Sequence, residues 1–348
     1  MTYFKPLVCA LALASSFGIA GAQQLPKTEL KVVGTWSNLS QYKNFEQPFW
    51  SKEITEKSGG AITADVKGFN EMGLKGGEIG RLMKQGVIDF GSTVLGYMAS
   101  DDAKNEAIDL AGLSPDIGTA RKVSEAYRPV LDKLYKDKFN VKLLGVWPYS
   151  AQVVYCKSPI AGLADLKGKK VRTGNRTLAE FVGALGGTGV TLPFGEVVQA
   201  LQSGVVDCAI TGTLSGYSAK WYEVSDYIYS LPVGWSQVMH GVNYATWNKL
   251  DPKVRSLLEV EIKGLEERIW KAADVESAEG IACNTGVGKC SQGQPASMKL
   301  VKFAESDKAL LKKTLEEVVL KKWGERCGKA CAKEFNDTVG KVVAVTIK

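Results

Sequence analysis

Apolar residues along the chain recur with two spacings, one typical of β-strands and one typical of amphipathic helices. Short alternating or fully apolar runs predict strands, at 30–35, 61–69, 89–94, 141–146, 152–156, 171–172 and 238–246. Apolar positions three or four residues apart predict helices, at 76–85, 119–138, 175–185 and 251–279. Since helices and strands alternate, the pattern predicts an α/β fold.

One helix-turn-strand segment occurs twice. Residues 78–92 recur 118 positions later within residues 196–211, with Glu, Gly and Asp in register. In each copy a glycine, Gly86 or Gly204, follows the helix and can adopt the left-handed conformation that ends it. Two half-units so far apart predict two similar lobes with a ligand cleft between them, because α/β sheets place ligands beyond the carboxyl ends of their strands. The alternative is a chance match of a common Gly-Val-Val-Asp pattern.

The order of the elements suggests bounds for the lobes. We expect lobe I to comprise residues 27–149 and 238–270, and lobe II to comprise 150–237 and 281–345. The helix predicted over 251–279 begins with an N-cap aspartate and a proline. At 1.5 Å per residue it would span about 40 Å, enough to brace both lobes.

The N-terminus has the pattern of a secretory signal peptide. Lys5 precedes a mainly apolar run that closes on Ala20-Gly21-Ala22. The run is too short to span a bilayer, so we expect cleavage after Ala22 and a periplasmic protein. A retained anchor is the alternative, and Cys9 lies inside the apolar run and would be removed with it.

Composition limits the possible partners. About 325 residues remain after cleavage, enough for two domains with cores of their own. The net charge of +7 becomes +6 when Lys5 is removed, and the charges are scattered. Because no stripe of Lys and Arg is interleaved with aromatic residues, nucleic acid is not an expected partner. Anionic solutes are compatible with the mild positive charge.

Six cysteines remain after cleavage, and an even number in an oxidising compartment favours disulfides. Six cysteines allow fifteen pairings. We expect Cys156 to pair with Cys208 because both lie on candidate strands of lobe II, and we expect the local bridges Cys283–Cys290 and Cys327–Cys331. Zinc is the alternative, but the spacings are not those of paired C-x2-C motifs and His240, the single histidine, lies far from them. No metal is expected.

Arg172 is the strongest candidate for a ligand contact. It ends a predicted strand and precedes a helix that starts near Asn175, so its guanidinium should project into the cleft beside a helix N-terminus. The planar guanidinium can donate two parallel hydrogen bonds to a carboxylate. A surface arginine in a basic turn with Lys169 and Lys170 is the alternative, and Arg176 is a second candidate.

Other candidates lie at predicted loops and strand ends. Aromatic rings there can cover the apolar part of a small ligand, and polar side chains can orient it. The residues that we select are Trp36, Asn70, Glu71, Tyr97, Trp147, Gln152, Thr211 and Trp235.

Enzyme signatures are missing. The sequence has no G-x-S-x-G, no H-E-x-x-H and no phosphate-binding loop, and a glycine cluster at 183–189 follows a helix rather than a strand. We expect His240 to be a strand residue near the core, and we expect neither catalysis nor a cofactor. A secreted hydrolase or isomerase on a similar scaffold is the alternative.

Three segments resemble a known family. They are 165–172 (Asp-Leu-Lys-Gly-Lys-Lys-Val-Arg), 192–207 (Leu-Pro-Phe-Gly-Glu through Gly-Val-Val-Asp) and 243–252, which ends in Leu-Asp-Pro. They are similar to the solute-binding subunits of tripartite ATP-independent periplasmic (TRAP) transporters, and the similarity extends from about residue 31 to residue 271.

The resemblance implies a type II periplasmic binding fold, with two α/β lobes, a hinge and a long bracing helix. It implies a monomeric protein that closes on an organic acid and delivers it to a membrane permease, with Arg172 holding the carboxylate. Many family members have a polar run after the residue matching Asp207, whereas this chain continues Cys208-Ala-Ile-Thr-Gly212, and its tail is rich in cysteine. These departures leave the acid unnamed. An ATP-driven importer or a chemosensor would use the same fold.

Overall fold

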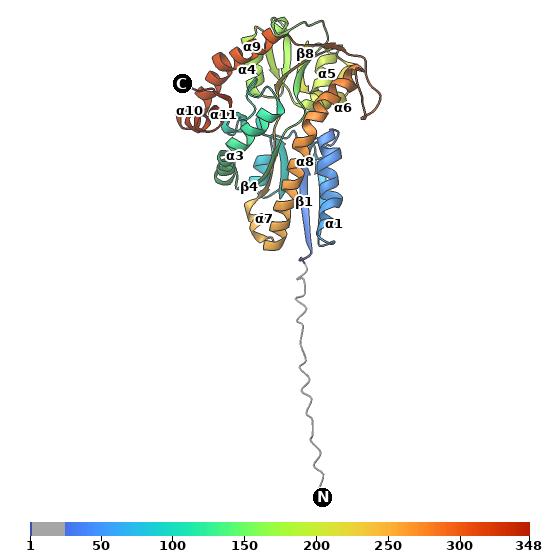
Figure 1. Cartoon of the computed structure of the whole chain (residues 1–348), viewed down its shortest axis with the longest axis vertical. Helices are drawn as coiled ribbons and strands as arrows, with labels where there is room; N and C mark the ends of the chain where they lie inside the picture. Colours follow the sequence, from blue (N-terminus) through green and yellow to red (C-terminus); the bar gives the residue numbers. More distant parts are fainter. Residues whose placement is uncertain (2–24) are drawn as a thin grey trace.

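The computed structural model describes residue 1 and residues 25–348. Its strands form two β-sheets, which lie one after the other along the long axis of the molecule (Figure 1). The first sheet has the order β2-β1-β3-β10-β4 and the second has the order β11-β9-β5-β8-β6-β7. The first contains β1 (Thr28–Gly34), β2 (Ile62–Gly68), β3 (Phe90–Val94), β4 (Val141–Trp147) and β10 (Val238–Asn243). The second contains β5 (Gln152–Cys156), β6 (Lys170–Thr173), β7 (Thr188–Thr191), β8 (Cys208–Gly212), β9 (Tyr227–Gly234) and β11 (Lys299–Val301). We call the two halves lobe I and lobe II; the α/β class is confirmed.

Helices cover both sheets (Figure 1). The α-helices, apart from the long α8, are α1 (Ile54–Lys57), α2 (Ile79–Lys84), α3 (Ile117–Phe139), α4 (Arg176–Ala184), α5 (Val197–Gln202), α6 (Thr213–Ser218), α7 (Tyr244–Lys249), α9 (Glu305–Thr314), α10 (Leu320–Asp337) and α11 (Val339–Val343). Short 3-10 turns are η3 (Phe69–Met72), η4 (Leu95–Met98), η5 (Ala103–Glu106), η6 (Leu163–Leu166), η7 (Phe194–Glu196) and η8 (Trp221–Glu223). Three short segments are π-helical, namely η1 (Tyr42–Glu46), η2 (Phe49–Glu53) and η9 (Leu315–Val319).

The repeated segment forms the same unit in each lobe. Helix α2 leads through Gly86, at φ 72°, into β3, and α5 leads through Gly204, at φ 74°, into β8. Each repeat strand then pairs in parallel with a neighbour, β3 with β1 and β8 with β6. The predicted duplication of helix, left-handed glycine and strand is confirmed.

Two short crossovers join the lobes. The first connects β4 to β5 through residues 148–151, and the second connects β9 to β10 through residues 235–237. The amide of Tyr149 donates to the carbonyl of Trp235 at 3.0 Å, so the crossovers are bonded to each other. The strand predicted over 238–246 ends at Asn243, because the Asn243 side chain accepts from the amides of Ala245 and Thr246 and starts α7.

Helix α8 (Pro252–Thr285) runs beside both lobes (Figure 1). Its 34 residues correspond to about 50 Å. The helix ends at Thr285 and is capped by Gly286, so it extends beyond the predicted end at residue 279 because lobe II stabilises its last turns. Gly280 lies against the backbone of Thr213, where a Cβ would be 2.4 Å from the Thr213 carbonyl carbon, and the Asn284 amide donates to the Thr213 carbonyl.

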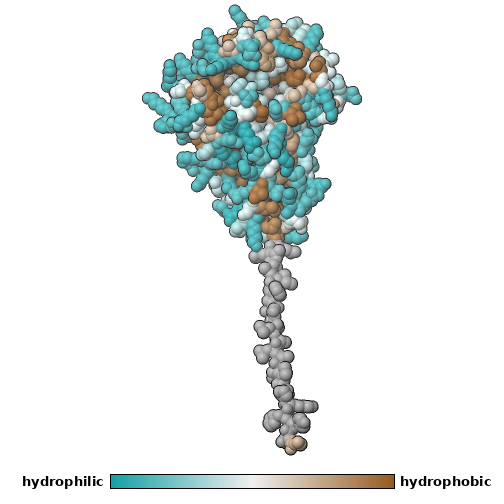
Figure 2. Space-filling view, in the orientation of Figure 1, coloured by the Kyte–Doolittle hydropathy of each residue, from teal (hydrophilic) through white to brown (hydrophobic). Residues whose placement is uncertain are grey.

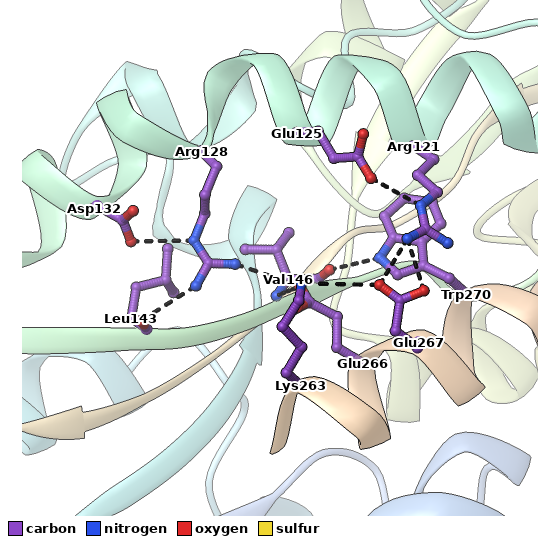
Figure 3. A network of polar contacts seen from close by, with 10 residues as sticks. All are labelled: Arg121, Glu125, Arg128, Asp132, Leu143, Val146, Lys263, Glu266, Glu267 and Trp270. Atoms are coloured by element: carbon purple, nitrogen blue, oxygen red, sulfur yellow. Dashed lines mark hydrogen bonds and ion pairs between the residues drawn. The ribbon is translucent and has the colours of Figure 1, made fainter. Parts of the chain in front are cut away.

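A polar network attaches α8 to lobe I (Figure 3). The Glu266 carboxylate accepts from the Val146 amide at 2.8 Å and from Arg128 at 3.4 Å, while the Trp270 indole donates to the Val146 carbonyl at 2.9 Å. Arg121 donates from α3 to both oxygens of Glu267 at 2.7 Å. Burial raises the pKa of Glu266, and the Val146 amide and Arg128 oppose that rise.

Replacing Glu266 by alanine should lower the free energy of unfolding by about 1–3 kcal/mol, because the Val146 amide and Arg128 would lose a buried acceptor. Glu267 is the control, since its side chain is 34% exposed and Glu267→Ala should cost less than about 1 kcal/mol. Urea unfolding of the two variants measures the difference. Equal losses would show that Glu266 is not the anchor of α8.

The cysteines pair as predicted. Cys156 and Cys208 lie directly opposite each other on β5 and β8, and both are fully buried. Cys283 and Cys290 bridge the end of α8 to the loop that follows it, and the sulfur atoms of Cys327 and Cys331 lie within bonding distance in α10. All six predicted disulfide cysteines are therefore paired in the structure.

The C-terminal segment, whose position the sequence did not predict, contacts both lobes. Trp323 of α10 donates its indole N–H to the carbonyl of Ala103. The guanidinium of Arg326 binds Glu106 at 3.0 Å and also binds Glu180 of α4. Strand β11 meanwhile extends the second sheet at its edge. The tail thus ties the loop after β3 to lobe II.

Hydrophilic side chains cover most of the visible face, and hydrophobic ones gather toward the end that carries α4, α5 and α9 (Figure 2). Within residues 25–348, no helix is long and apolar enough to cross a membrane. The predicted signal peptide, residues 1–22, lies outside the described residues apart from Met1.

Candidate functional site

Arg172 lies near the end of β6 with its side chain directed into the protein and only 2% of its surface exposed. Its Nε and Nη2 atoms donate to the Leu192 carbonyl at 3.0 and 2.9 Å, and its Nη1 donates to the Ile210 carbonyl at 3.0 Å. This burial excludes the alternative of a surface arginine. Arg176, the second candidate, is exposed at the start of α4.

The positive charge of Arg172 has no acidic partner among the described residues. Burial lowers the pKa of its guanidinium, and the Tyr97 side chain opposes this effect. The rings of Phe194 and Trp221 each lie 5.9 Å from the guanidinium carbon. A guanidinium has five N–H groups, so after three carbonyl contacts Nη1 and Nη2 each keep one for the Tyr97 hydroxyl or for a bound oxyanion.

A cavity of about 20 Å³ lies between the lobes, and although Arg172 does not line it, its neighbours Tyr97 and Phe194 do. Trp36, Leu39, Val94 and Tyr97 line it from lobe I, and Tyr149, Phe194, Thr211, Gly212, Ser215 and Ser236 line it from lobe II and the crossovers. The Trp36 and Phe194 rings meet across it with centroids 5.5 Å apart. A cavity of this size holds about one water molecule, so an organic acid can enter only if the lobes separate.

Two polar groups of the cavity lining lack partners. The Trp36 indole nitrogen and the Tyr149 hydroxyl are buried without a hydrogen bond, although Thr35 lies near Tyr149. Buried polar groups are nearly always paired, so unpaired ones need an explanation. Together with Arg172 they provide hydrogen-bond donors around an otherwise aromatic space.

The structure brings four of the nine predicted residues together, namely Arg172, Trp36, Tyr97 and Thr211. Gln152 is one contact away, since its amide donates to the Ser236 hydroxyl at 2.6 Å.

The other four predicted residues have structural contacts instead. Asn70 accepts from the Ser37 amide, and Glu71 caps η3 through the Gly68 amide. Trp147 is buried in the core against His240, and Trp235 donates its indole N–H to the Ser114 carbonyl. His240 hydrogen-bonds Ser92, and burial lowers its pKa to about 3, so it is the expected core histidine.

Several lining residues were not selected from the sequence. Phe194 follows Leu192-Pro193 inside the family-like segment, which was a usable signal. Tyr149, which directly follows Trp147-Pro148 at the predicted crossover, belongs to the aromatic cluster from which the sequence candidates were chosen. Nothing in the sequence marks Ser236 as a lining residue. Its side chain reaches the cavity because the backbone at Ser236 has φ 46°, a conformation that only the folded crossover imposes.

A larger pocket of about 470 Å³ adjoins the cavity, since Tyr97 lines both. Lys75 and Arg81 of lobe I and Arg176 of lobe II lie around it. Lys75 also reaches Glu196 of lobe II at 3.2 Å. Cationic side chains at the entrance of a cleft raise the local concentration of anionic solutes.

Glu46 is a buried carboxyl close to the first strand. It accepts from the Thr35 amide at 2.7 Å and from the Thr35 hydroxyl at 3.0 Å, and only 1% of its surface is exposed. Burial raises its pKa to about 7 against these hydrogen bonds, which lower it. The carboxyl therefore keeps a proton in the folded state over a pH range where the unfolded chain releases it.

Glu46 should make the protein less stable as the pH rises from about 4.5 to about 7, because folding then requires proton uptake by this group. We expect Glu46→Gln to make the slope of unfolding free energy against pH less negative, by up to about 1.4 kcal/mol per pH unit. Urea unfolding between about pH 5 and about pH 8 measures the slope. An identical slope in both proteins would contradict the assignment.

The sequence model of a family described as bacterial extracellular solute-binding protein, family 7 (DctP), matches residues 33–325. The ectoine-binding periplasmic protein TeaA of Halomonas elongata is 30% identical over 178 residues, which are 50% of this chain and 52% of TeaA. The ectoine/5-hydroxyectoine-binding protein UehA of Ruegeria pomeroyi is 36% identical over 108 residues, 31% of this chain and 32% of UehA. The chain therefore aligns with about half or less of these two relatives.

Solved structures agree over most of the chain. A Bordetella pertussis solute receptor, DctP6, described as binding pyroglutamic acid, superposes with a TM-score of 0.79 and 22% identity, covering 90% of this chain and 99% of the receptor. A TRAP periplasmic solute-binding protein from Rhodoferax ferrireducens with bound malonate gives a TM-score of 0.79 and 19% identity, covering 90% and 98%. At these identities the likeness shows the two-lobe fold.

Proposed function

The chain belongs to family 7 of the bacterial extracellular solute-binding proteins, and we propose that it captures a small organic carboxylate between its lobes. The resemblance to TRAP solute-binding subunits that the sequence predicts is confirmed by the family match. The main support for a carboxylate ligand is the buried guanidinium of Arg172, which has no acidic partner among the described residues. A buried charge is stable only when it is paired, and a bound carboxylate would pair it.

Capture would proceed by lobe closure. With the lobes apart, the carboxylate would meet the free Nη1 and Nη2 protons of Arg172 as a bidentate pair. Closure would then bring Trp36 of lobe I against Phe194 of lobe II and cover the remainder of the acid with rings. The Trp36 indole and the Tyr149 hydroxyl would supply further hydrogen bonds. A ligand drives closure only if it binds the closed form more tightly.

The wider biological setting belongs to the same proposal. We expect the signal peptide to be removed after Ala22, and the mature monomer to work in the periplasm and to deliver the acid to a TRAP-type permease, without cofactor or catalysis. The lobe bounds 27–149 with 238–270, and 150–237 with 281–345, remain our assignment. They are supported by the membership of β1–β4 and β10 in one sheet.

The test is a ligand screen of the purified mature protein. Thermal unfolding would be followed with pyroglutamate, malonate, succinate, L-gulonate, orotate, galacturonate and ectoine, which known relatives and similar structures are described as binding. We expect a carboxylate to raise the melting temperature and to bind with one-to-one stoichiometry by titration calorimetry. Turnover of the acid would favour the enzyme alternative, and the absence of binding by any carboxylate would overturn the proposal.

A further inference from the structure

The crossover from β9 to β10 is held by one carboxylate. Asp109, in the loop before α3, accepts from the backbone amide of Trp235 at 2.7 Å, and the next two amides, of Ser236 and Gln237, lie close enough to lower its pKa. Burial raises the pKa of Asp109 to about 7, and the three amides oppose that rise. Three successive amides around one carboxylate fix the direction of the chain where it passes between the lobes.

The segment held in this way has an unfavourable backbone conformation. Ser236 has φ 46°, in the left-handed region that residues with a Cβ rarely occupy. Such a residue persists only where its surroundings impose the conformation. Gly234, two residues earlier, is crowded by side chains, since a Cβ there would lie 2.8 Å from Gln152 Oε1 and 3.3 Å from Asp109 Oδ1.

The strained residue is also part of the binding cavity. Ser236 lines the cavity beside Tyr149 and Thr211, and its hydroxyl accepts from Gln152 at 2.6 Å. The conformation of residues 235–237 therefore determines where one wall of the cavity lies.

The loop that carries Asp109 contacts the crossover along its length. The Gly112 amide donates to the Val233 carbonyl at 3.0 Å, and the Gln237 side chain donates to the Ile108 carbonyl at 3.2 Å. At the start of the same loop, Glu106 is bound by Arg326 of α10. Asp109 thus projects from a loop fixed on both sides.

We propose that Asp109 is a positioning residue for ligand binding, and this rests on the proposed capture of a carboxylate. Its carboxylate holds residues 235–237 in the strained conformation that presents Ser236 to the cavity and sets the angle at which the lobes meet. Asp109 does not line the cavity, so its effect on affinity passes through the backbone of the crossover.

The key variant is Asp109→Asn, which keeps the size of the side chain but replaces one acceptor oxygen by a donor. The matched control is Glu266→Gln, because Glu266 also accepts a backbone amide but lies on α8, outside the crossovers. Both variants should lower the melting temperature. At about pH 8, above the pKa of Asp109, only Asp109→Asn should weaken binding of the tightest acid from the screen, by about tenfold or more, as expected for loss of a hydrogen bond to a charged group.

A double-mutant cycle with Ser236→Gly separates positioning from general destabilisation. Glycine adopts a positive φ without strain, so the crossover would then depend less on Asp109. We expect Asp109→Asn to reduce affinity several-fold less in the Ser236→Gly background. Additive effects, or equal affinity losses for Asp109→Asn and Glu266→Gln, would overturn the proposal. If Asp109→Asn does not fold, Asp109→Glu, which displaces the carboxylate by one methylene, takes its place.

A ligand-free measurement keeps this proposal distinct from the proposed function. Nitroxide labels at the exposed positions 31 and 167, one in each lobe, would report the distance between the lobes by pulsed electron paramagnetic resonance. We expect Asp109→Asn to broaden the distance distribution more than Glu266→Gln, which weakens the attachment of α8 to lobe I but leaves residues 235–237 in place. If the wild-type protein binds no carboxylate, the capture proposal is wrong, but the role of Asp109 in positioning the crossover is still tested by the distance measurement. An unchanged distribution in Asp109→Asn would refute the positioning of the crossover.

Discussion

Replacing Arg172 by methionine should weaken binding of the preferred carboxylate by about 2–5 kcal/mol, the usual cost of removing one partner of a buried charge pair. The same change should leave the ligand-free protein no less stable. Arg172 is 2% exposed and has no carboxylate partner among the described residues. Burying its charge therefore costs folding free energy that only a bound ligand would offset. Titration calorimetry and thermal unfolding of the same samples measure both effects.

Two further variants make this prediction specific. Arg172→Lys keeps the charge but loses the planar pair of N–H groups, so we expect an intermediate loss of affinity. Arg176→Met removes an exposed guanidinium from the adjoining pocket and should leave affinity within about threefold, as expected for a screened surface charge. Unchanged affinity in Arg172→Met would remove the central contact from the proposed site.

Removing the disulfide between Cys156 and Cys208 should lower the free energy of unfolding by about 4 kcal/mol, from the chain entropy of a loop closed over 52 residues. Both sulfurs are fully buried and join paired residues of β5 and β8 at the centre of the second sheet. The double variant Cys156→Ala/Cys208→Ala avoids a free thiol. Urea unfolding at neutral pH gives the change.

The control for this prediction is the bridge between Cys283 and Cys290. It closes a loop of only 7 residues, so Cys283→Ala/Cys290→Ala should cost about 2 kcal/mol in the same chain-entropy treatment. If the two double variants lost equal stability, the entropy of the closed loops would not explain the contribution of the buried bridge.

Most of the helices and strands could be predicted from the local pattern of apolar and polar residues. The duplicated helix-glycine-strand segment was visible because a left-handed glycine and an apolar strand are encoded within about a dozen neighbouring residues. The end of α8 was missed for the opposite reason. Residues 271–285 have a weak apolar spacing, and their helix is stabilised by contacts with Thr213 of lobe II, which is distant in sequence.

The candidate site divides in the same way. Arg172 and Thr211 lie near the carboxyl ends of β6 and β8, and Trp36 and Tyr97 follow β1 and β3, so the order of elements along the chain was enough to select them. Trp147 and Trp235 lie at equally suitable positions in the chain but turn into the core. The direction of a side chain at a crossover depends on which neighbours fill the space on each side, and a local pattern does not contain that information.

The sequence by itself determined the α/β class, the duplicated helix-glycine-strand unit and an arginine at the end of a strand, because each rests on a pattern of residues close together in the chain. It left fifteen cysteine pairings open, and the tertiary structure decided among them, since Cys156 and Cys208 are 52 residues apart. Only the tertiary structure decided that this arginine is buried without an acidic partner, that the cavity beside it holds about 20 Å³, and that Asp109 holds the crossover. These features arise where segments distant in the sequence meet, 20 and 38 residues apart for the carbonyls that bind Arg172 and 126 residues apart for Asp109 and Trp235. Their energies depend on desolvation and on distances that exist only after the lobes have packed.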